Sequence, residues 1–233
     1  MDSENFRMNG YKILNAPHGF PDTKNLIEAN IVGVKSKASI YGPVYSKKVI
    51  SYALNFISDK TGEGVSEKIE TLEQLAEYLL SKTDKYPTSY CSIVYADIKT
   101  EVELQGEVGA ATRIGEMGWW RGFKGDPAER NVNVEKLLLD VYNASISLKL
   151  CPKEFGYKVN SDGTADLLLP SCYYKDACLR AFSENILRRV DGRMMCPVVS
   201  SLCQFFKFSS GYDWDYDLIE FNKPHCIAKA YML

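Results

Sequence analysis

Long apolar runs are missing from this sequence of 233 residues, and no uninterrupted stretch reaches the roughly 18 apolar residues that span a bilayer. The polar residues 1–11 also lack the apolar segment of a secretory leader. Basic residues are not in excess, because 28 Lys and Arg face 30 Asp and Glu and form no stripe interleaved with aromatics. We therefore expect a cytoplasmic protein with no membrane anchor and no nucleic-acid partner.

Familiar active-site signatures are missing too. The sequence has no G-x-S-x-G, P-loop, Rossmann glycine pattern, EF-hand or H-E-x-x-H, which removes the usual serine hydrolase, nucleotide, calcium and metalloprotease interpretations. Only two histidines, His18 and His225, are available as general bases. An ordinary loop or surface position explains either histidine, and a carboxylate or Tyr173 could serve as the base instead.

What is present suits one globular domain. Hydrophobic residues make up 45% of the chain, enough for a real core, so we expect a single domain over residues 1–233. The seven cysteines are an odd number in a chain without a leader, which favours reduced thiols over a disulfide framework. A homodimer is compatible with the 15 tyrosines and 10 phenylalanines, but nothing locates an interface.

The spacing of apolar residues predicts an α+β fold. Residues 1–40 are punctuated by proline and glycine and read as an extended arm, with a short strand at 31–34. Residues 41–150 read as mainly helical, and residues 151–233 as a sheet with two helices. The expected helices cover residues 44–57, 72–80, 134–150, 173–187 and 197–208, and the expected strands 155–159, 165–169, 214–221 and 226–232. We predict a four-stranded antiparallel sheet covered on one side by a helical layer.

Local signals support several of these elements. Thr71 and Gln74 predict a capping box, and Asp162-Gly163 predicts a hairpin turn. In the last hairpin, pairing of Glu220 with Cys226 would turn Cys226 inward with Trp214 and leave the alternating aspartates of that strand solvated.

The glycine-rich segment between residues 90 and 123 fits a helix better than a strand. It ends in Trp119, Trp120 and Arg121 between glycines. These side chains suit a packed core with a cation–π contact, or the wall of an apolar ligand pocket.

The cysteines are the strongest functional signal. Cys196 precedes Pro197 at the start of a predicted helix, where the helix N-terminus would stabilise its thiolate. Cys172 follows a predicted strand and Cys226 lies on the last one. The three thiols fit a reactive site, a zinc site or inert buried thiols. Zinc is the weaker of the two functional uses, because the sequence has no C-x-x-C and Cys203 lies roughly 10 Å along the helix from Cys196.

The cysteine pattern resembles a known family. Pro170-Ser-Cys172-Tyr-Tyr, then Cys196-Pro followed by Cys203, then a late strand with Cys226, is similar to the L-2-amino-thiazoline-4-carboxylic acid hydrolase family and, more remotely, to 4-vinyl reductase or hydrocarbon-binding domains. The resemblance covers residues 165–233. It implies a compact α+β domain with helices against an antiparallel sheet. The chain departs from the pattern before the last cysteine, with Asn-Lys-Pro-His in place of a Gly-Asp step.

Two functions follow from these observations. One is a cysteine-dependent, hydrolase-like enzyme for a small C–N or C–S bonded substrate, with Cys196 as nucleophile beside Cys172 and Cys226. The other is a non-catalytic binding domain for an apolar small molecule or cofactor, with structural or metal-bound thiols. The residues expected to contact the ligand are Trp119, Trp120, Arg121 and Tyr173. Zinc would be held by the three cysteines.

Overall fold

The computed structural model describes residues 9–19, 21–65, 68–108, 130, 132–221 and 225–233. Contacts within the chain divide it into two compact units. The sheet unit comprises Met1–Pro21, Glu116–Cys172 and Arg193–Leu233, and the helical unit comprises Asp22–Gly115 and Tyr173–Gly192. Both units are therefore assembled from separated segments. The single domain expected from the sequence stays a prediction.

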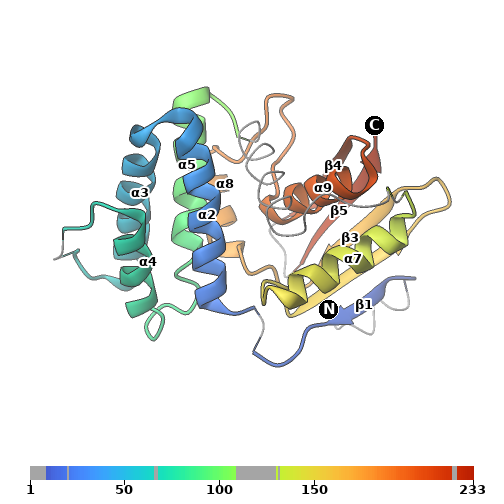
Figure 1. Ribbon diagram of the computed structural model, residues 1–233, viewed down its shortest axis with the longest axis horizontal. Helices are drawn as coiled ribbons and strands as arrows, with labels where there is room; N and C mark the ends of the chain where they lie inside the picture. The colour runs from blue at the N-terminus through green and yellow to red at the C-terminus, as the bar shows by residue number, and fades with distance from the viewer. Residues whose placement is uncertain (1–8, 20, 66–67, 109–129, 131, 222–224) are drawn as a thin grey trace. The chain divides into compact units, whose positions relative to one another are not determined.

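The sheet unit holds five antiparallel strands in the order β1-β2-β3-β5-β4, so the α+β prediction is confirmed (Figure 1). The strands are β1 (Lys12–Asn15), β2 (Glu154–Val159), β3 (Ala165–Leu169), β4 (Trp214–Glu220) and β5 (Cys226–Met232). Two helices, α7 (Val134–Ser147) and α9 (Pro197–Ser210), pack on this sheet. The predicted number of four strands is wrong, because β1 comes from the expected arm and pairs with β2.

A glycine helps β1 to join the sheet. Gly156 pairs with Ile13, and an ideal Cβ at Gly156 would lie 2.9 Å from Ile13 Cδ1 and 3.0 Å from Leu168 Cβ. Since real Cβ atoms do not approach so closely, only glycine lets the Ile13 side chain lie against this face.

Strand alternation explains how the sheet packs on α9. Tyr216 pairs with Ala230, and Trp214, two residues earlier on β4, therefore points to the same face. The Trp214 ring meets Phe206 of α9 edge to face at 5.1 Å, and its Nε1 donates to Ser210 Oγ at 3.1 Å. The small Ala230 side chain leaves room for these large rings against the sheet.

The last hairpin shows one difference in register. Glu220 pairs with Ile227 and not with Cys226, because β4 carries an irregularity between Leu218 and Glu220. Up to Leu218 the predicted register holds, with Leu218 opposite Ala228. Cys226 therefore keeps its expected place on the same face as Trp214. An extra residue of this kind bends a strand and shifts only the pairs beyond it.

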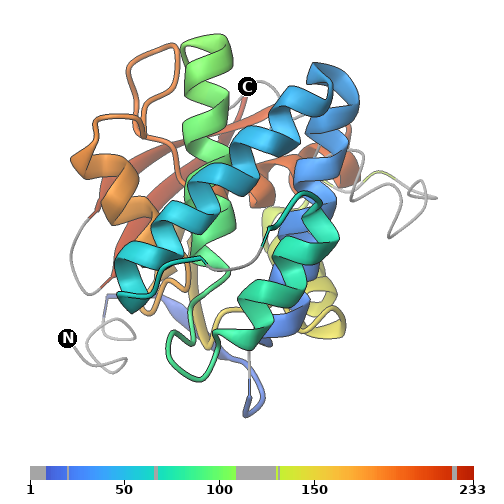
Figure 2. The ribbon, with the colours of Figure 1, turned by 90° about the vertical axis from the view of Figure 1, so that its left-hand side faces the viewer.

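The helical unit contains no described strand and consists of five described helices. They are α2 (Thr23–Tyr41), α3 (Pro43–Thr61), α4 (Leu72–Ser81), α5 (Cys91–Gln105) and α8 (Lys175–Ser183). Figure 2 shows α3 crossing in front of α5, with which it makes its main contacts. None of the described helices combines the length and the apolar character needed to cross a membrane.

The prediction of an extended arm over residues 1–40 is wrong from residue 23 onward. Residues 23–41 form α2, and the strand expected at 31–34 lies inside this helix. Its buried residues Leu26, Ile27, Ile31 and Val34 recur at helical spacing. Asp22 caps the helix by accepting a hydrogen bond from the Asn25 N–H at 3.0 Å. Burial of this apolar stripe stabilises the helix by more than Gly33, which lies within the helix, destabilises it.

Other local predictions are confirmed. Thr71 and Gln74 form both hydrogen bonds of the capping box at the start of α4. Gly163, at a φ of 80°, closes the turn between β2 and β3. The helix expected between residues 90 and 123 is confirmed over α5, which ends at Gln105 with Gly106 as its C-cap, and residues 109–123 lie outside the described residues. Trp119, Trp120 and Arg121 lie outside the described residues.

Candidate functional site

Cys196 is the N-cap residue of α9, as the sequence predicted. Its backbone is extended, with φ −121° and ψ 113°, and Pro197 takes the first helical position. Its carbonyl accepts the first helical hydrogen bond from the Ser200 N–H at 2.8 Å. The residue is buried, with 6% of its surface exposed. The helix start therefore holds this thiol inside the sheet unit.

The sheet brings two more thiols toward it. Cys226 begins β5 and pairs with Leu169, the last residue of β3. Cys172 follows Leu169 by three residues. Both thiols lie near enough to Cys196 for their charges to act on it. We call the surroundings of these three cysteines, after the end of β3, at the start of α9 and at the start of β5, the thiol site.

Cys196 is held as a neutral thiol. Burial raises its pKa most, and the nearby Cys172 and Cys226 raise it further. The backbone N–H groups of Val198 and Val199 act in the opposite direction, although among the described residues the side chain completes no capping hydrogen bond to the helix. The net result is a raised pKa, so the resting sulfur is protonated at neutral pH. This differs from the thiolate expected at a helix N-terminus, because desolvation outweighs the helix N–H groups.

No family model, curated protein or solved structure matches the chain. The resemblance over residues 165–233 and the activity it implies therefore stay predictions. Within the described residues, no group of three His, Cys, Asp or Glu side chains is placed to hold a metal ion. The proposed zinc site rests on the sequence alone.

Tyr173, expected at the ligand, belongs to an aromatic cluster of the helical unit. Its ring lies 4.5 Å from that of Tyr174 and 6.4 Å from that of Tyr90, measured between centroids. Its carbonyl accepts a hydrogen bond from Cys91 Sγ at 3.3 Å. These contacts pack Tyr173 into the helical unit, and its predicted contact with a ligand stays a prediction.

The two histidines differ in their surroundings. His18 is exposed, in agreement with a loop position. His225 is buried, and its Nε2 lies 3.0 Å from Glu220 Oε2. His225 lies just before β5 begins, and its ring is engaged by Glu220.

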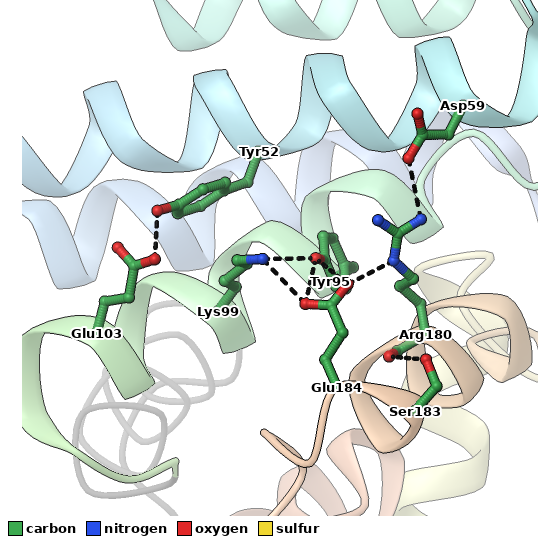
Figure 3. Close-up of polar contacts among 8 residues, drawn as sticks. All are labelled: Tyr52, Asp59, Tyr95, Lys99, Glu103, Arg180, Ser183 and Glu184. Carbon is green, nitrogen blue, oxygen red and sulfur yellow. Dashed lines mark hydrogen bonds and ion pairs between the residues drawn. The ribbon is translucent and has the colours of Figure 1, made fainter.

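A second polar cluster lies in the helical unit, centred on Glu184 (Figure 3). Its carboxylate accepts hydrogen bonds from Arg180 Nε at 2.5 Å, Lys99 Nζ at 2.9 Å and the Tyr95 hydroxyl at 2.8 Å. Arg180 also reaches Asp59 at 3.0 Å. Partial burial acts to raise the pKa of Glu184, but its three donors outweigh burial and hold the pKa at about 2. The charges pair among themselves, which indicates a structural network joining α3, α5 and α8.

This network predicts a pH-dependent loss in the Glu184→Gln variant. A folded pKa of about 2 lies below the unfolded value of about 4.3, so ionised Glu184 stabilises the folded state above about pH 4. Because water still reaches part of the side chain, we expect a loss of about 1 kcal/mol at pH 7 in urea denaturation. The difference from wild type should shrink as the pH falls from about 4 toward 2. Glu77→Gln, at an exposed position of α4, is the control, and an equal effect there would contradict the prediction.

A third cluster is more deeply buried. Lys37 of α2 pairs with Asp97 and, at 3.0 Å, with Glu101 of α5. The side chains of Lys37 and Glu101 are only 5% and 1% exposed. The Tyr45 hydroxyl donates to Asp97 at 2.7 Å. Burial acts to lower the pKa of Lys37, but the two carboxylates raise it beyond its usual range, so Lys37 stays charged. A permanently charged lysine is no nucleophile.

Proposed function

We propose that the protein binds a small apolar molecule at the thiol site, with Cys196 as a neutral thiol. The observation that carries this proposal is the burial of Cys196 beside Cys172 and Cys226. A protonated thiol behaves as a small hydrophobe with a weak donor. Cys226 has Leu169 as its strand partner and Ala228 on the same face, so its surroundings are apolar as well. Such a lining suits an apolar ligand better than an ionic one.

The resemblance over residues 165–233 supports the same proposal from the sequence. Among the similar families are hydrocarbon-binding domains, whose name describes apolar ligands. The cytoplasmic location and the reduced state of the thiols are part of this proposal.

A cysteine-dependent hydrolase is the second candidate. The observation that favours it is the action of the Val198 and Val199 N–H groups on Cys196, since such groups also stabilise charge that develops during acyl transfer. Against it stands the raised pKa, because the thiolate is the nucleophile. A substrate would have to bring its own activating group. The alkylation behaviour of Cys196 separates the two candidates.

Alkylation by iodoacetamide, with each cysteine identified by mass spectrometry, tests the proposal. We expect Cys196 to react more slowly at pH 7 than the half-buried Cys172 and Cys226, because it is buried and neutral. Addition of the uncharged apolar dye Nile red should slow the reaction of Cys172 and Cys226 further. Cys151, buried elsewhere in the sheet unit, should be unaffected by the dye.

Two results would decide against binding. If Cys196 reacts ahead of every other thiol at pH 7, the hydrolase candidate replaces the binding proposal. If the dye protects neither cysteine and native mass spectrometry of freshly purified protein shows no retained small molecule, the binding proposal is wrong.

A further inference from the structure

The segment that leads into Cys196 is attached to β4 at two points. Arg193 precedes Cys196 by three residues, and both belong to the sheet unit. In the described sheet β4 is an edge strand, with β5 as its one neighbour. An edge strand leaves room for a chain to pass around it.

Arg193 makes the first of these two attachments to β4. Its guanidinium donates to Asp215 Oδ2 at 2.6 Å and to Asp217 Oδ1 at 2.8 Å. It also donates to the Tyr231 hydroxyl at 2.5 Å. Asp215 and Asp217 alternate along β4 and share one face, and Tyr231 is the strand partner of Asp215. The aspartates expected in solvent thus bind an arginine, and the Asp215 side chain keeps only 13% of its surface exposed.

Tyr216 makes the second attachment, on the opposite face of the same strand. Its hydroxyl accepts a hydrogen bond from the Cys196 N–H at 2.8 Å and donates to the Cys196 carbonyl at 3.3 Å. Tyr216 is buried, so these hydrogen bonds are shielded from water. One hydroxyl therefore contacts both polar backbone groups of the residue that carries the thiol.

From this arrangement we infer that Arg193 and Tyr216 are positioning residues for the thiol of Cys196. The chain is bound to one face of β4 through Arg193, crosses the edge of the strand and is bound to the other face through Tyr216. These contacts fix the backbone of Cys196 and so the direction in which its Cα–Cβ bond points. They hold the sulfur near Cys172 and Cys226 and keep it away from water. The inference deepens the proposed function and rests on the thiol site being its ligand site.

The Tyr216→Phe variant tests the inference through a ratio of two rates. It keeps the ring and removes the hydroxyl that holds Cys196. We expect water to reach the sulfur, and the iodoacetamide rate of Cys196 at pH 8 to rise about 10-fold relative to that of Cys203. Cys203 lies on the same helix and is also buried, so a general loosening of α9 would raise both rates together. Only a local effect on Cys196 changes the ratio.

Matched variants complete the experiment. Tyr157→Phe removes the hydroxyl of another buried tyrosine of this sheet, which contacts Glu135, and should leave the ratio unchanged. Arg193→Gln should raise the ratio about 3-fold, and Arg193→Lys, which keeps the charge, should raise it less.

The inference fails if the ratio in Tyr216→Phe and Arg193→Gln stays within about 2-fold of wild type, or if Cys196 and Cys203 accelerate together. These rates are measured without any ligand. They can therefore support the positioning role even if no small molecule binds, and a bound dye would not rescue the inference if the ratio does not move.

Discussion

Replacement of Lys37 by methionine should destabilise the helical unit by about 3–5 kcal/mol, the usual cost of breaking a buried ion pair by removing one partner. Lys37 is the shared partner of Asp97 and Glu101, and its side chain is 5% exposed. Methionine fills a similar volume, so the loss reports charge and not a cavity. Urea denaturation followed by far-UV circular dichroism measures it, because this unit is helical.

A neighbouring lysine supplies the control. Lys35 lies on the same helix and pairs with Glu73, but both side chains are more than half exposed. Lys35→Met should therefore cost far less. Equal losses in the two variants would show that burial of the Lys37 cluster contributes nothing to the free energy of unfolding.

A second variant tests whether the unpaired charges cause this loss. Loss of the Lys37 charge leaves the carboxylates of Asp97 and Glu101 without their shared cation, which is the main source of the expected loss. The double variant Lys37→Met with Glu101→Leu removes a positive and a negative charge together, and should recover a large part of the loss.

Truncation of Phe206 to alanine should be comparably severe in the sheet unit, with a loss of about 3–5 kcal/mol. Phe206 is fully buried on α9, and its ring packs against Trp214 of β4. The truncation removes both the buried surface and an aromatic contact, and the surrounding strands are too constrained to close the cavity. Urea denaturation gives the loss, and near-UV circular dichroism should show the altered environment of Trp214.

Phe182 provides the comparison for Phe206. It lies on α8 with 43% of its surface exposed, so Phe182→Ala should cost under about 1 kcal/mol. Phe206→Leu, which keeps most of the volume, should fall between the two. A loss in Phe206→Ala no larger than in Phe182→Ala would mean that α9 is not held to the sheet by this contact.

The fold was predictable wherever one side of an element is apolar and the period is clear. Four strands and most helices follow from such patterns, and the Thr71 capping box follows from side-chain chemistry. The helix over residues 23–41 was missed, because Gly33 and the prolines before it suggested an arm, whereas the chain buries an apolar stripe there. β1 was missed because four residues carry too little periodicity, and its partner β2 lies far along the chain.

The positions of the three cysteines in the fold were predictable, but the electrostatics of Cys196 were not. Cys196 before Pro197 signals a helix start, and strand patterns place Cys172 and Cys226 at ends of elements. The sequence does not give the depth of burial. Because burial raises the pKa of Cys196, the structure favours a neutral thiol where the sequence predicted a thiolate. Arg193 and Tyr216 were missed, since their contacts join residues about 20 positions apart through the edge of one strand. The alternating aspartates were the available signal, because carboxylates that share one face of a strand favour a basic partner.

The place of β5 has a consequence for synthesis on the ribosome. It is the last of the described strands to be made, yet it fills the gap between β3 and β4. Until its seven residues emerge, the backbone groups along one side of the apolar strand β3 lack their partner. A nascent chain that stalls before residue 226 would expose this unpaired strand edge to other polypeptides, and chaperones would have to shield it.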